Sequence, residues 1–596
     1  DNDTSLQVET ASGKRAKVKA ANVLLRFAAG ALHGFMAQAQ TLADDIDLDF
    51  LWQCCGEEEF DFQSLARDYF GRAPSAVEAA ALLLKLHSAP MYFYRRGKGR
   101  YKAAPEDALK SALAAVERKE RQAQLQQRYV EELSAGRFPA EFEPLRERLL
   151  YKPDRNTVEA KALESVCEQL KLSPAKLFER CGALPSSAQY HLGRFLFENF
   201  PQGTGFPELA LPELPADLPL AGAPAYSIDD AATTEIDDAF SVVRRDGGGW
   251  RVGVHIAAPA LGIEIGSPLD EVARQRLSTV YMPGDKITML PAAAIERYTL
   301  AAGKALPALS FYAEVSPSLE IVGTESRIES VRIADNLRHD TLDALFSAEA
   351  VRAGHVEHPF GAELLALHGL AERLEAARGR ADQAREARAE YSFHIEGDRV
   401  RIVERKRGAP IDKVVSELMI LVNTRWAQML DERGWGAIFR SQREGKVKLS
   451  TVGAPHQGLG VERYVWASSP LRRYVDLVNQ RQLVALLRDE APPYPHNSEA
   501  LYAAMRAFEL TYDIYAEFQR QMERYWCLRW IVQEHAATLS ARIIRENLVR
   551  LDRLPLVLRV PSLPELPAGS RIELAVSAVD LLDLGIECEF RERLAA

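Results

Sequence analysis

The spacing of hydrophobic residues in the first hundred positions predicts helices followed by a hairpin. Residues 59–72 and 74–88 carry apolar side chains at intervals of three and four, as amphipathic helices do. Residues 91–102 are aromatic and basic and contain turn-forming glycines, which is typical of a β-hairpin. Two helices and a basic hairpin follow one another in this order in a winged helix. We therefore predict a winged-helix-like region over residues 1–104.

A helical block and a linker are predicted next. A long charged helix is expected near residues 105–134 and shorter helices near 156–198, which together define a helical domain over residues 105–200. Prolines then recur at short intervals through residues 201–224. Because proline removes a backbone donor and fixes φ, this stretch excludes a regular helix or a central strand and indicates a linker.

From residue 225 onward, strand and helix patterns mix. Strands are expected near residues 225–229, 238–244, 250–257 and 307–316, a hairpin near 391–404, and helices near 360–390, 412–433, 470–488 and 498–536. Residues 537–596 alternate apolar and polar positions between proline and glycine turns, as in a small β-barrel. The chain is therefore predicted to be an α+β multidomain protein, with a mixed α/β domain at 225–536 and a barrel at 537–596.

Composition narrows the class of protein. With 596 residues, of which 47% are hydrophobic, the chain can form several cores, about four domains by length alone. A net charge of −10 argues against a protein covered by nucleic acid, so any such contact must be local. The six cysteines contain no CxxC pair and suggest reduced thiols rather than a zinc site. No signal peptide or membrane-spanning run is evident, which predicts a cytoplasmic protein without membrane contact.

The most informative stretch is residues 229–238, where five acids occupy ten positions between two β-prone runs. Such acids repel one another unless a cation lies among them. Magnesium prefers oxygen ligands, and two such ions can hold the attacking water and the leaving oxygen of a phosphodiester. The alternative is an acid-rich turn that is merely solvated. We predict a metal site for phosphoryl transfer, with the ligands Asp229, Glu235, Asp237 and Asp238.

The spacing Asp229-x5-Glu235-x-Asp237-Asp238 resembles the acidic signature of the ribonuclease II and ribonuclease R (RNB) family, which usually has Asp where this chain has Glu235. Further blocks follow in the family's order: Val254-His255-Ile256-Ala257, Tyr281-Met282-Pro283-Gly284, Met289-Leu290-Pro291 and Ser468-Ser469-Pro470-Leu471-Arg472-Arg473-Tyr474. The resemblance implies an RNB catalytic domain at 225–536 and an S1-like oligonucleotide-binding (OB) barrel at the C-terminus. It departs at the N-terminus, where family members commonly carry two cold-shock domains.

Arg472 is a candidate phosphate ligand. Ser469 and Pro470 predict the N-cap and first residue of a helix, which would put Arg472 and Arg473 in its first turn, where an anion should compensate their charge. The alternative is a surface pair between Arg472 and Asp476. The resemblance implies that Arg472 stabilises the scissile phosphate, and we assign Arg473 to RNA binding.

Three positions are candidates for contact with the terminal nucleotides. The resemblance implies that Tyr281 contacts the 3′-terminal nucleotide and that Glu523 contacts its ribose. Without it, Tyr281 would be a core residue and Glu523 a solvated one. An aromatic residue of the 391–404 hairpin would complete a stack of bases. Phe393 is our choice, and Tyr391 on the same strand face is the alternative.

The basic hairpin near residues 91–102 is a candidate for RNA binding away from the active site. Its positive charges and neighbouring tyrosines suit phosphate contacts and base stacking, although a solvated hairpin has the same composition. The assigned residues are Arg95, Arg96, Lys98 and Arg100. His255, despite its place beside the acidic motif, is interpreted as a structural strand residue.

Together these features imply a processive 3′-to-5′ exoribonuclease that degrades single-stranded RNA to 5′-mononucleotides. It would use one or two Mg²⁺ ions, with Mn²⁺ as an alternative, and act as a monomer without an obligate protein partner. Two other functions stay open. Because Glu235 departs from the pattern, the chain could be a catalytically silent RNA-binding protein of the same fold. The helical N-terminus also fits an exonuclease that trims structured RNA 3′ ends.

Overall fold

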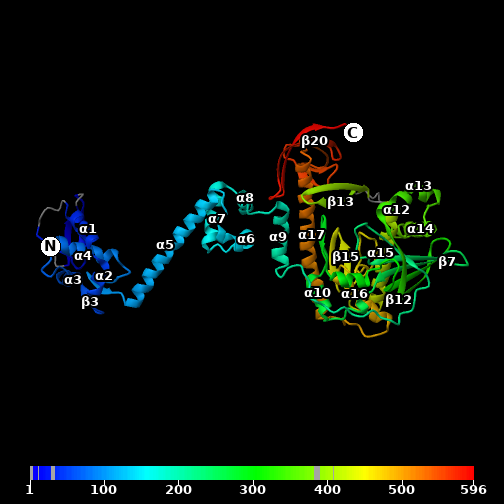
Figure 1. The fold of residues 1–596 in the computed structure, drawn as a ribbon, viewed down its shortest axis with the longest axis horizontal. Helices are drawn as coiled ribbons and strands as arrows, with labels where there is room; N and C mark the ends of the chain where they lie inside the picture. Colours follow the sequence, from blue (N-terminus) through cyan, green and yellow to red (C-terminus); the bar gives the residue numbers. More distant parts are fainter. Residues whose placement is uncertain (1–3, 11–12, 29–33, 381–388, 407–408, 596) are drawn as a thin grey trace. The chain divides into compact units, whose positions relative to one another are not determined.

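The computed structural model describes residues 4–595 except 11–12, 29–33, 381–388 and 407–408. The chain divides into two compact units, Asp1–Ala183 and Leu184–Ala596. The finer boundaries expected from the sequence, at residues 104, 200, 224 and 536, stay predictions within these units. The elements are labelled in Figure 1.

The first half of unit 1 combines helices with a small sheet. Its helices are η1 (Ala20–Asn22), α1 (Phe35–Asp45), α2 (Leu48–Gln53), α3 (Phe62–Phe70) and α4 (Ala76–Ser88), and its strands are β1 (Ser5–Glu9), β2 (Arg15–Lys19), β3 (Glu59–Asp61), β4 (Phe93–Gly97) and β5 (Arg100–Ala103). Strands β1 and β2 pair with each other, and the other three form a sheet in the order β3-β5-β4. Ser75 and Glu78 start α4 with a capping box. Leu51, Leu82 and Phe93 lie in the shared core.

The second half of unit 1 is helical, as predicted. It contains α5 (Glu106–Ser134), η2 (Ala140–Leu145), α6 (Arg146–Tyr151), α7 (Val158–Leu170) and α8 (Pro174–Arg180). Helices α5 and α7 pack against each other. Helix α9 (Ser187–Asn199), which the sequence placed in the same block, belongs to unit 2.

A closed barrel forms the centre of unit 2. Its strands are β6 (Ala225–Asp229), β7 (Asp238–Arg244), β8 (Trp250–Ala257), β11 (Ala305–Val315) and β12 (Ile321–Arg338), in the order β11-β12-β6-β7-β8. All neighbours are antiparallel except β12 and β6, which are parallel. Strand β8 is buried from Val252 to Ala257, so both of its faces are covered. The predicted strands at 225–229, 238–244 and 250–257 are confirmed.

Helices pack around this barrel. They are η3 (Pro259–Leu261), α10 (Pro268–Arg276), α11 (Ala292–Tyr298), α12 (His339–Leu345), α13 (Ala348–Ala353), α14 (Gly361–Ala377), α15 (Pro410–Glu432), α16 (Tyr474–Leu487) and α17 (Glu499–Gln533). Helix α15 buries Leu418, Val422 and Trp426 in the same core as barrel residues, because they recur at intervals of four on one face. Helix α17 contacts β9, β14 and β20, and it extends from the barrel region to the C-terminal sheet (Figure 1).

Three hairpins lie outside the barrel: β9 (Val280–Met282) with β10 (Asp285–Ile287), β13 (Ala389–Glu396) with β14 (Arg399–Lys406), and β15 (Phe439–Arg443) with β16 (Lys446–Ser450). The turn between β9 and β10 requires glycine. Gly284 has φ +81°, and a Cβ atom there would lie 2.6 Å from Cγ1 of Ile395. Glycine therefore lets this turn approach hairpin β13–β14 closely.

The C-terminal sheet has five antiparallel strands: β17 (Thr538–Arg545), β18 (Leu548–Leu551), β19 (Val557–Arg559), β20 (Arg571–Asp580) and β21 (Gly585–Arg593). Their order is β19-β18-β17-β20-β21. Alternate residues Leu539, Ala541 and Ile543 of β17 face its core. This order of strands is consistent with the predicted OB fold.

The predicted start of one helix is wrong. Ser469 and Pro470 do not begin a helix, because α16 starts at Tyr474 with Arg473 as its N-cap residue. Arg473 is extended and bridges to Ser278, and the Ser469 hydroxyl accepts a hydrogen bond from Arg472 instead of capping. Tertiary contacts thus override the local capping signal at this position.

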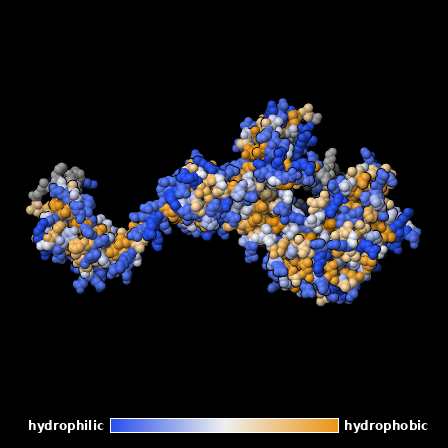
Figure 2. All heavy atoms as spheres, in the orientation of Figure 1, coloured by the Kyte–Doolittle hydropathy of each residue, from blue (hydrophilic) through white to orange (hydrophobic). Residues whose placement is uncertain are grey.

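The surface of unit 2 is mixed in character. Figure 2 shows hydrophilic atoms interrupted by hydrophobic patches, and the exposed apolar side chains include Val322, Leu510 and Ile514. Within the described part of the chain, no helix combines the length and apolar character needed to cross a membrane.

Candidate active site

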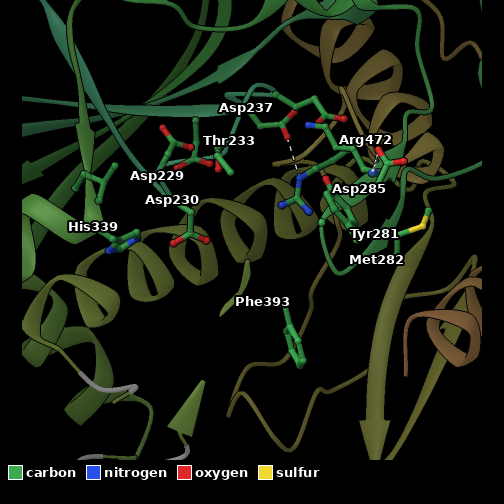
Figure 3. A pocket seen from close by; sticks show the side chains of 16 residues that line it. Asp229, Asp230, Thr233, Asp237, Tyr281, Met282, Asp285, His339, Phe393 and Arg472 are labelled. Atoms are coloured by element: carbon green, nitrogen blue, oxygen red, sulfur yellow. Dashed lines mark hydrogen bonds and ion pairs between the residues drawn. The ribbon is translucent and has the colours of Figure 1, made fainter. Parts of the chain in front are cut away.

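A cavity of about 720 Å³ opens beside one end of the barrel, and Figure 3 shows the side chains that line it. Its sixteen lining residues include the four predicted acids together with Tyr281, Phe393 and Arg472. They come from β6, the loop to β7, the start of β7, hairpins β9–β10 and β13–β14, helix α12 and the segment before α16. The structure therefore brings these predicted residues together from segments more than 200 positions apart.

The acidic loop is held in place by backbone contacts. Strand β6 ends at Asp229 and β7 begins at Asp238, so the loop between them lies at one end of the barrel. The Thr299 hydroxyl accepts a hydrogen bond from the Ile236 N–H at 2.8 Å and donates one to the Thr234 carbonyl at 3.0 Å. These bonds tie the loop to the residue that follows α11.

Asp237 and Arg472 form an ion pair at the cavity wall. Arg472 donates through Nε to Oδ2 of Asp237 at 3.1 Å, and the Leu471 N–H donates to Oδ1 at 2.9 Å. Asp237 is 3% exposed, and burial raises its pKa to about 7 although the Arg472 charge opposes the shift. Asp237 thereby orients the guanidinium, and the Arg472 side chain keeps 37% of its surface exposed.

Asp229 and Asp238 are crowded, and neither forms an ion pair within the described residues. Burial raises the pKa of Asp238 to about 8, and the charges of Asp229 and Asp237 add to the shift. Burial also raises the pKa of Asp229, whose Oδ2 accepts a hydrogen bond from the Ser227 hydroxyl at 2.6 Å. Since repulsion and burial both disfavour the charged forms, a cation between these carboxylates would stabilise them.

Glu235 faces a lysine that the sequence did not point to. Lys286 of β10 contacts Oε2 of Glu235 and donates to the Thr234 hydroxyl oxygen at 2.7 Å. The Thr279 hydroxyl donates to Oε1 of Glu235 at 3.1 Å. Lys286 follows Gly284 by two positions in the Tyr-Met-Pro-Gly block, which was the only available signal. Thus the acid that departs from the family pattern is held by an ammonium group.

The two predicted aromatic residues lie on different walls. Tyr281 lies in β9 near Arg472, and burial raises the pKa of its hydroxyl. Phe393 projects from β13, and Figure 3 shows its ring separated from the acids by the open interior of the cavity. Between them, the two rings leave room for flat groups next to the acids and Arg472.

Comparison with known proteins agrees with this geometry. The model of the RNB domain matches residues 219–451 and 445–489. Residues 219–489 therefore match an RNB domain. The predicted resemblance is confirmed, and the cavity lies within the RNB domain.

Two curated relatives share this region. An uncharacterized ribonuclease of Synechocystis is 28% identical over 412 residues, covering 62% of this chain and 59% of that protein. Exoribonuclease 2 of Sodalis glossinidius is 28% identical over 356 residues, covering 49% of this chain and 54% of the enzyme. The chain thus matches between about half and three-fifths of the length of these curated relatives.

Solved structures show the same fold. The Dss1 exoribonuclease of Candida glabrata, in an active-site variant, has a TM-score of 0.60 at 16% identity and covers 98% of this chain and 94% of its own. RNase R of Mycoplasma genitalium has a TM-score of 0.56 at 14% identity, covering 68% and 78%. Yeast Ssd1, a pseudonuclease, has a TM-score of 0.52 at 18% identity, covering 64% and 57%. Because nucleases and a pseudonuclease share the fold, the fold alone does not decide catalysis.

The four predicted acids that line the cavity are chemically suited to bind a divalent cation. All donors are carboxylate oxygens, as Mg²⁺ and Mn²⁺ prefer, and the four acids outnumber the two cations that contact them. Among the residues that the structure describes, however, no three His, Cys, Asp or Glu side chains are already arranged around a metal position. Glu235 and Asp237 are engaged by Lys286 and Arg472, which leaves Asp229 and Asp238 as the less constrained donors.

Other predicted residues lie outside the lining of this cavity. Glu523 on α17 accepts a hydrogen bond from Gln519 at 2.8 Å, and Tyr391 lies near Arg550 of the C-terminal sheet. Arg473 pairs with Asp476 through Nε at 2.7 Å and Nη2 at 2.8 Å. The partner of Asp476 is therefore Arg473, not Arg472.

Two further predictions concern His255 and the basic hairpin of unit 1. His255 is fully buried between the hydroxyls of Ser241 and Ser310, at 2.8 and 2.7 Å, which confirms it as a structural residue of β8. In unit 1, Arg96 and Arg100 lie 3.4 and 3.8 Å from the carboxylate of Glu59, on the exposed hairpin β4–β5. Arg95 and Lys98 are exposed on the same hairpin.

Proposed function

We propose that this protein is a magnesium-dependent 3′-to-5′ exoribonuclease that degrades single-stranded RNA processively to 5′-mononucleotides. The observation that carries the proposal is the cavity in which four acids and the Asp237-bound guanidinium of Arg472 meet. Relatives named exoribonuclease 2 support the reaction type. A structure of Mycoplasma genitalium RNase R with single-stranded RNA supports the substrate class.

The residues of the cavity divide the chemistry between them. Asp229, Glu235, Asp237 and Asp238 would hold the ion, which when bound supplies Lewis-acid activation of water and charge neutralisation at the phosphate. Arg472 donates hydrogen bonds to the scissile phosphate from the part of its guanidinium that faces the cavity. Asp237 acts through Arg472 as well, because its carboxylate fixes the direction of the guanidinium.

The aromatic residues position the end of the RNA chain. Tyr281, beside Arg472, contacts the terminal nucleotide and carries the proposed ribose contact, since Glu523 does not line the cavity. Phe393 on the other wall stacks on a base. DNA should therefore bind through its phosphates and bases but lack the 2′-hydroxyl contact next to the scissile bond.

The regions outside the RNB domain would guide RNA. The element order α1, α2, β3, α3, α4, β4, β5 and the sheet order β3-β5-β4 support a winged helix in unit 1, with the basic hairpin β4–β5 as its RNA contact. The strand order of the C-terminal sheet supports an S1-like OB domain, a fold that binds oligonucleotides.

The decisive experiment compares wild type with Asp237→Asn on a labelled oligo(A) in magnesium, under single-turnover conditions. We expect the variant to bind RNA but to cleave at least about 100-fold more slowly, because it loses one carboxylate charge while retaining the hydrogen-bonding shape. Asp246→Asn, the same change in the exposed β7–β8 loop, is the matched control. Cleavage by Asp237→Asn within tenfold of wild type would overturn the proposed site.

A catalytically silent RNA-binding protein is the second candidate. The ion pair between Lys286 and Glu235 favours it, because a bound ammonium group competes with a metal ion for this carboxylate. The structural similarity to the pseudonuclease Ssd1 points the same way. Pure wild-type protein that binds oligo(A) but leaves it intact with magnesium, manganese and other divalent ions would establish this function instead.

A further inference from the structure

A second cavity, of about 440 Å³, lies in unit 2 between hairpin β15–β16 and helix α17. It shares no lining residue with the catalytic cavity. The residues that give it chemical character are Arg440, Lys448, Trp466, Phe508, Tyr512 and Asp513. Its volume falls in the range of about 300 to 1,000 Å³ that is usual for small-molecule sites.

Arg440 is a cation without a matching carboxylate. Its guanidinium carbon lies 4.5 Å from the centre of the Trp466 ring, and its one side-chain hydrogen bond, over the described residues, joins Nη1 to Nε2 of His456 at 3.3 Å. No ion pair forms at Arg440 within the same set of residues. Burial lowers the pKa of His456 to about 4, so this ring is neutral and adds no anion. A partly buried, unpaired guanidinium is costly, and an anionic ligand would offset that cost.

Aromatic rings form the wall beside this guanidinium. Tyr512 is 37% exposed and stacks on the buried ring of Phe508 with centroids 5.0 Å apart. Trp466 meets Tyr512 edge-on at 5.8 Å. The Tyr512 ring is therefore supported from behind and accessible from the cavity. A supported, accessible ring next to a flat guanidinium suits a planar heterocycle.

The acidic residues of the lining do not cancel the positive charge. Glu509 is already satisfied, because Arg506 donates to its Oε2 at 2.9 Å and the Leu449 N–H donates to its Oε1 at 3.3 Å. Asp513 is exposed and can accept hydrogen bonds from ribose hydroxyls or from base N–H groups. Lys448, exposed on β16, provides a second positive charge.

We propose that this cavity is a second nucleotide-binding site, separate from the catalytic cavity. Arg440 and Lys448 bind the phosphate, Tyr512 stacks on the base, and Asp513 accepts hydrogen bonds from the sugar or the base. The ligand is either a free nucleoside 5′-monophosphate or one nucleotide within an RNA chain, which share this chemistry.

Titration calorimetry of the full-length protein in EDTA, where metal-assisted cleavage is suppressed, tests the proposal. If the ligand is a free nucleotide, we expect the wild type to have a 5′-AMP site whose affinity is at least tenfold weaker in Arg440→Gln. Arg443→Gln is the matched control, because Arg443 lies on the same strand with its side chain 86% exposed and does not line the cavity. If Arg440→Gln binds both 5′-AMP and a ten-residue oligo(A) as tightly as the wild type does, the proposal is overturned.

Two further measurements complete the test. Titration with a ten-residue oligo(A) distinguishes the two sources of the ligand. If Arg440→Gln binds the oligomer more weakly than the wild type does but binds 5′-AMP equally well, the site takes a nucleotide within an RNA chain. If circular dichroism shows that Arg440→Gln is unfolded, the surface variant Lys448→Ala/Tyr512→Ala replaces it. The same loss of nucleotide affinity is expected, and unchanged affinity would again overturn the proposal. Cleavage of a short oligomer should stay within twofold of wild type in these variants, so failure here is distinct from failure of the catalytic proposal.

Discussion

The carboxylates of the catalytic cavity differ in what holds them. Asp237 is bound by a guanidinium and a backbone N–H, and Glu235 by an ammonium group and a hydroxyl. Asp238 forms no ion pair within the described residues, and burial with two acidic neighbours raises its pKa to about 8. Charge is therefore least compensated at Asp238, which makes it the residue most sensitive to a bound cation.

Magnesium binding should depend on pH through Asp238. A cation that binds there must displace the proton, so the apparent association constant should rise by about tenfold per pH unit between pH 7 and pH 8 and level off above pH 8. Below pH 7 the rise should be steeper, because Asp237 is then protonated as well. Calorimetric titration of wild type with magnesium at pH 6, 7, 8 and 9 measures this dependence, and Asp238→Asn should bind weakly and lose the rise between pH 7 and pH 8. Equal affinity at pH 6 and pH 8 would contradict the assignment of Asp238 as a ligand.

Glu235 and Lys286 should be energetically coupled. Glu235→Gln or Lys286→Met alone leaves one buried or partly buried charge without its partner, whereas the double variant removes both. Urea unfolding of the four proteins in EDTA should give a coupling free energy of about 1 to 3 kcal/mol. Pairing Lys286→Met with Asp335→Asn, an exposed acid on β12, provides a control cycle. Additive effects for Glu235 and Lys286 would show that the ion pair contributes nothing to stability.

Sequence motifs predicted the cavity better than they predicted its internal contacts. The spacing of the acids, the Tyr-Met-Pro-Gly block and the arginine motif predicted six residues that line one cavity. They could not show that Lys286 reaches Glu235, because that contact depends on the turn at Gly284 and not on local pattern. Glu523 was assigned by resemblance alone, and it is not among the residues that line the cavity.

At the scale of elements, a buried ion pair ties α16 to α10. Arg481 donates through Nη2 to Oδ1 of Asp270 at 2.7 Å, and the Tyr474 hydroxyl donates to the same oxygen at 2.9 Å. The Gly266 N–H donates to Oδ2 at 2.8 Å. Asp270 is 1% exposed, so its charge depends entirely on these donors. The pair therefore fixes the helix whose N-terminus follows Arg472.

Arg481→Met should destabilise the protein by about 3 to 5 kcal/mol, because it leaves the carboxylate of Asp270 buried and without a cation. Chemical denaturation followed by circular dichroism measures the loss. Arg488→Met, at the exposed end of the same helix, should change stability by no more than about 0.5 kcal/mol. Similar values for the two variants would mean that the buried pair is dispensable.

Elements with regular periodicity were predictable, and those shaped by their neighbours were not. The β6, β7 and β8 strands and helix α15 follow their patterns. Strand β12 was missed because many of its eighteen residues are charged and exposed. Its apolar and polar positions therefore do not alternate regularly enough to indicate a strand. Helix α14 ends at Ala377, earlier than expected, and the part of that prediction over residues 381–388 lies outside the described residues.

At the scale of the whole molecule, we propose that the basic hairpin β4–β5 of unit 1 binds long RNA, whereas cleavage takes place in unit 2. Replacing Arg95, Arg96, Lys98 and Arg100 with Ala should weaken binding of long RNA and reduce the slope of log affinity against log salt by up to about 3, because each lost phosphate contact contributes about 0.7. Cleavage of a four-residue oligomer should be unchanged. Filter binding over a salt series and a cleavage assay measure the two effects.

The control for this variant removes the same charge from another exposed surface of unit 1. It replaces the α5 residues Lys110, Arg118, Lys119 and Arg121 with Ala. An equal loss of long-RNA affinity in both variants would point to net charge rather than to the hairpin. An equal loss of short-oligomer cleavage in the hairpin variant would instead link the hairpin to the catalytic cavity.

Helix α17 has a consequence for how this chain can change in evolution. Its 35 residues form one continuous helix, about 52 Å long, that contacts β9, which carries Tyr281, the strand β14, and β20 of the C-terminal sheet. Inserting a single residue midway would turn everything beyond it by about 100° and move it by about 1.5 Å. Selection should therefore remove insertions and deletions from this helix, whereas loops should tolerate them. The length of the helix should stay constant among related chains while its exposed residues are substituted.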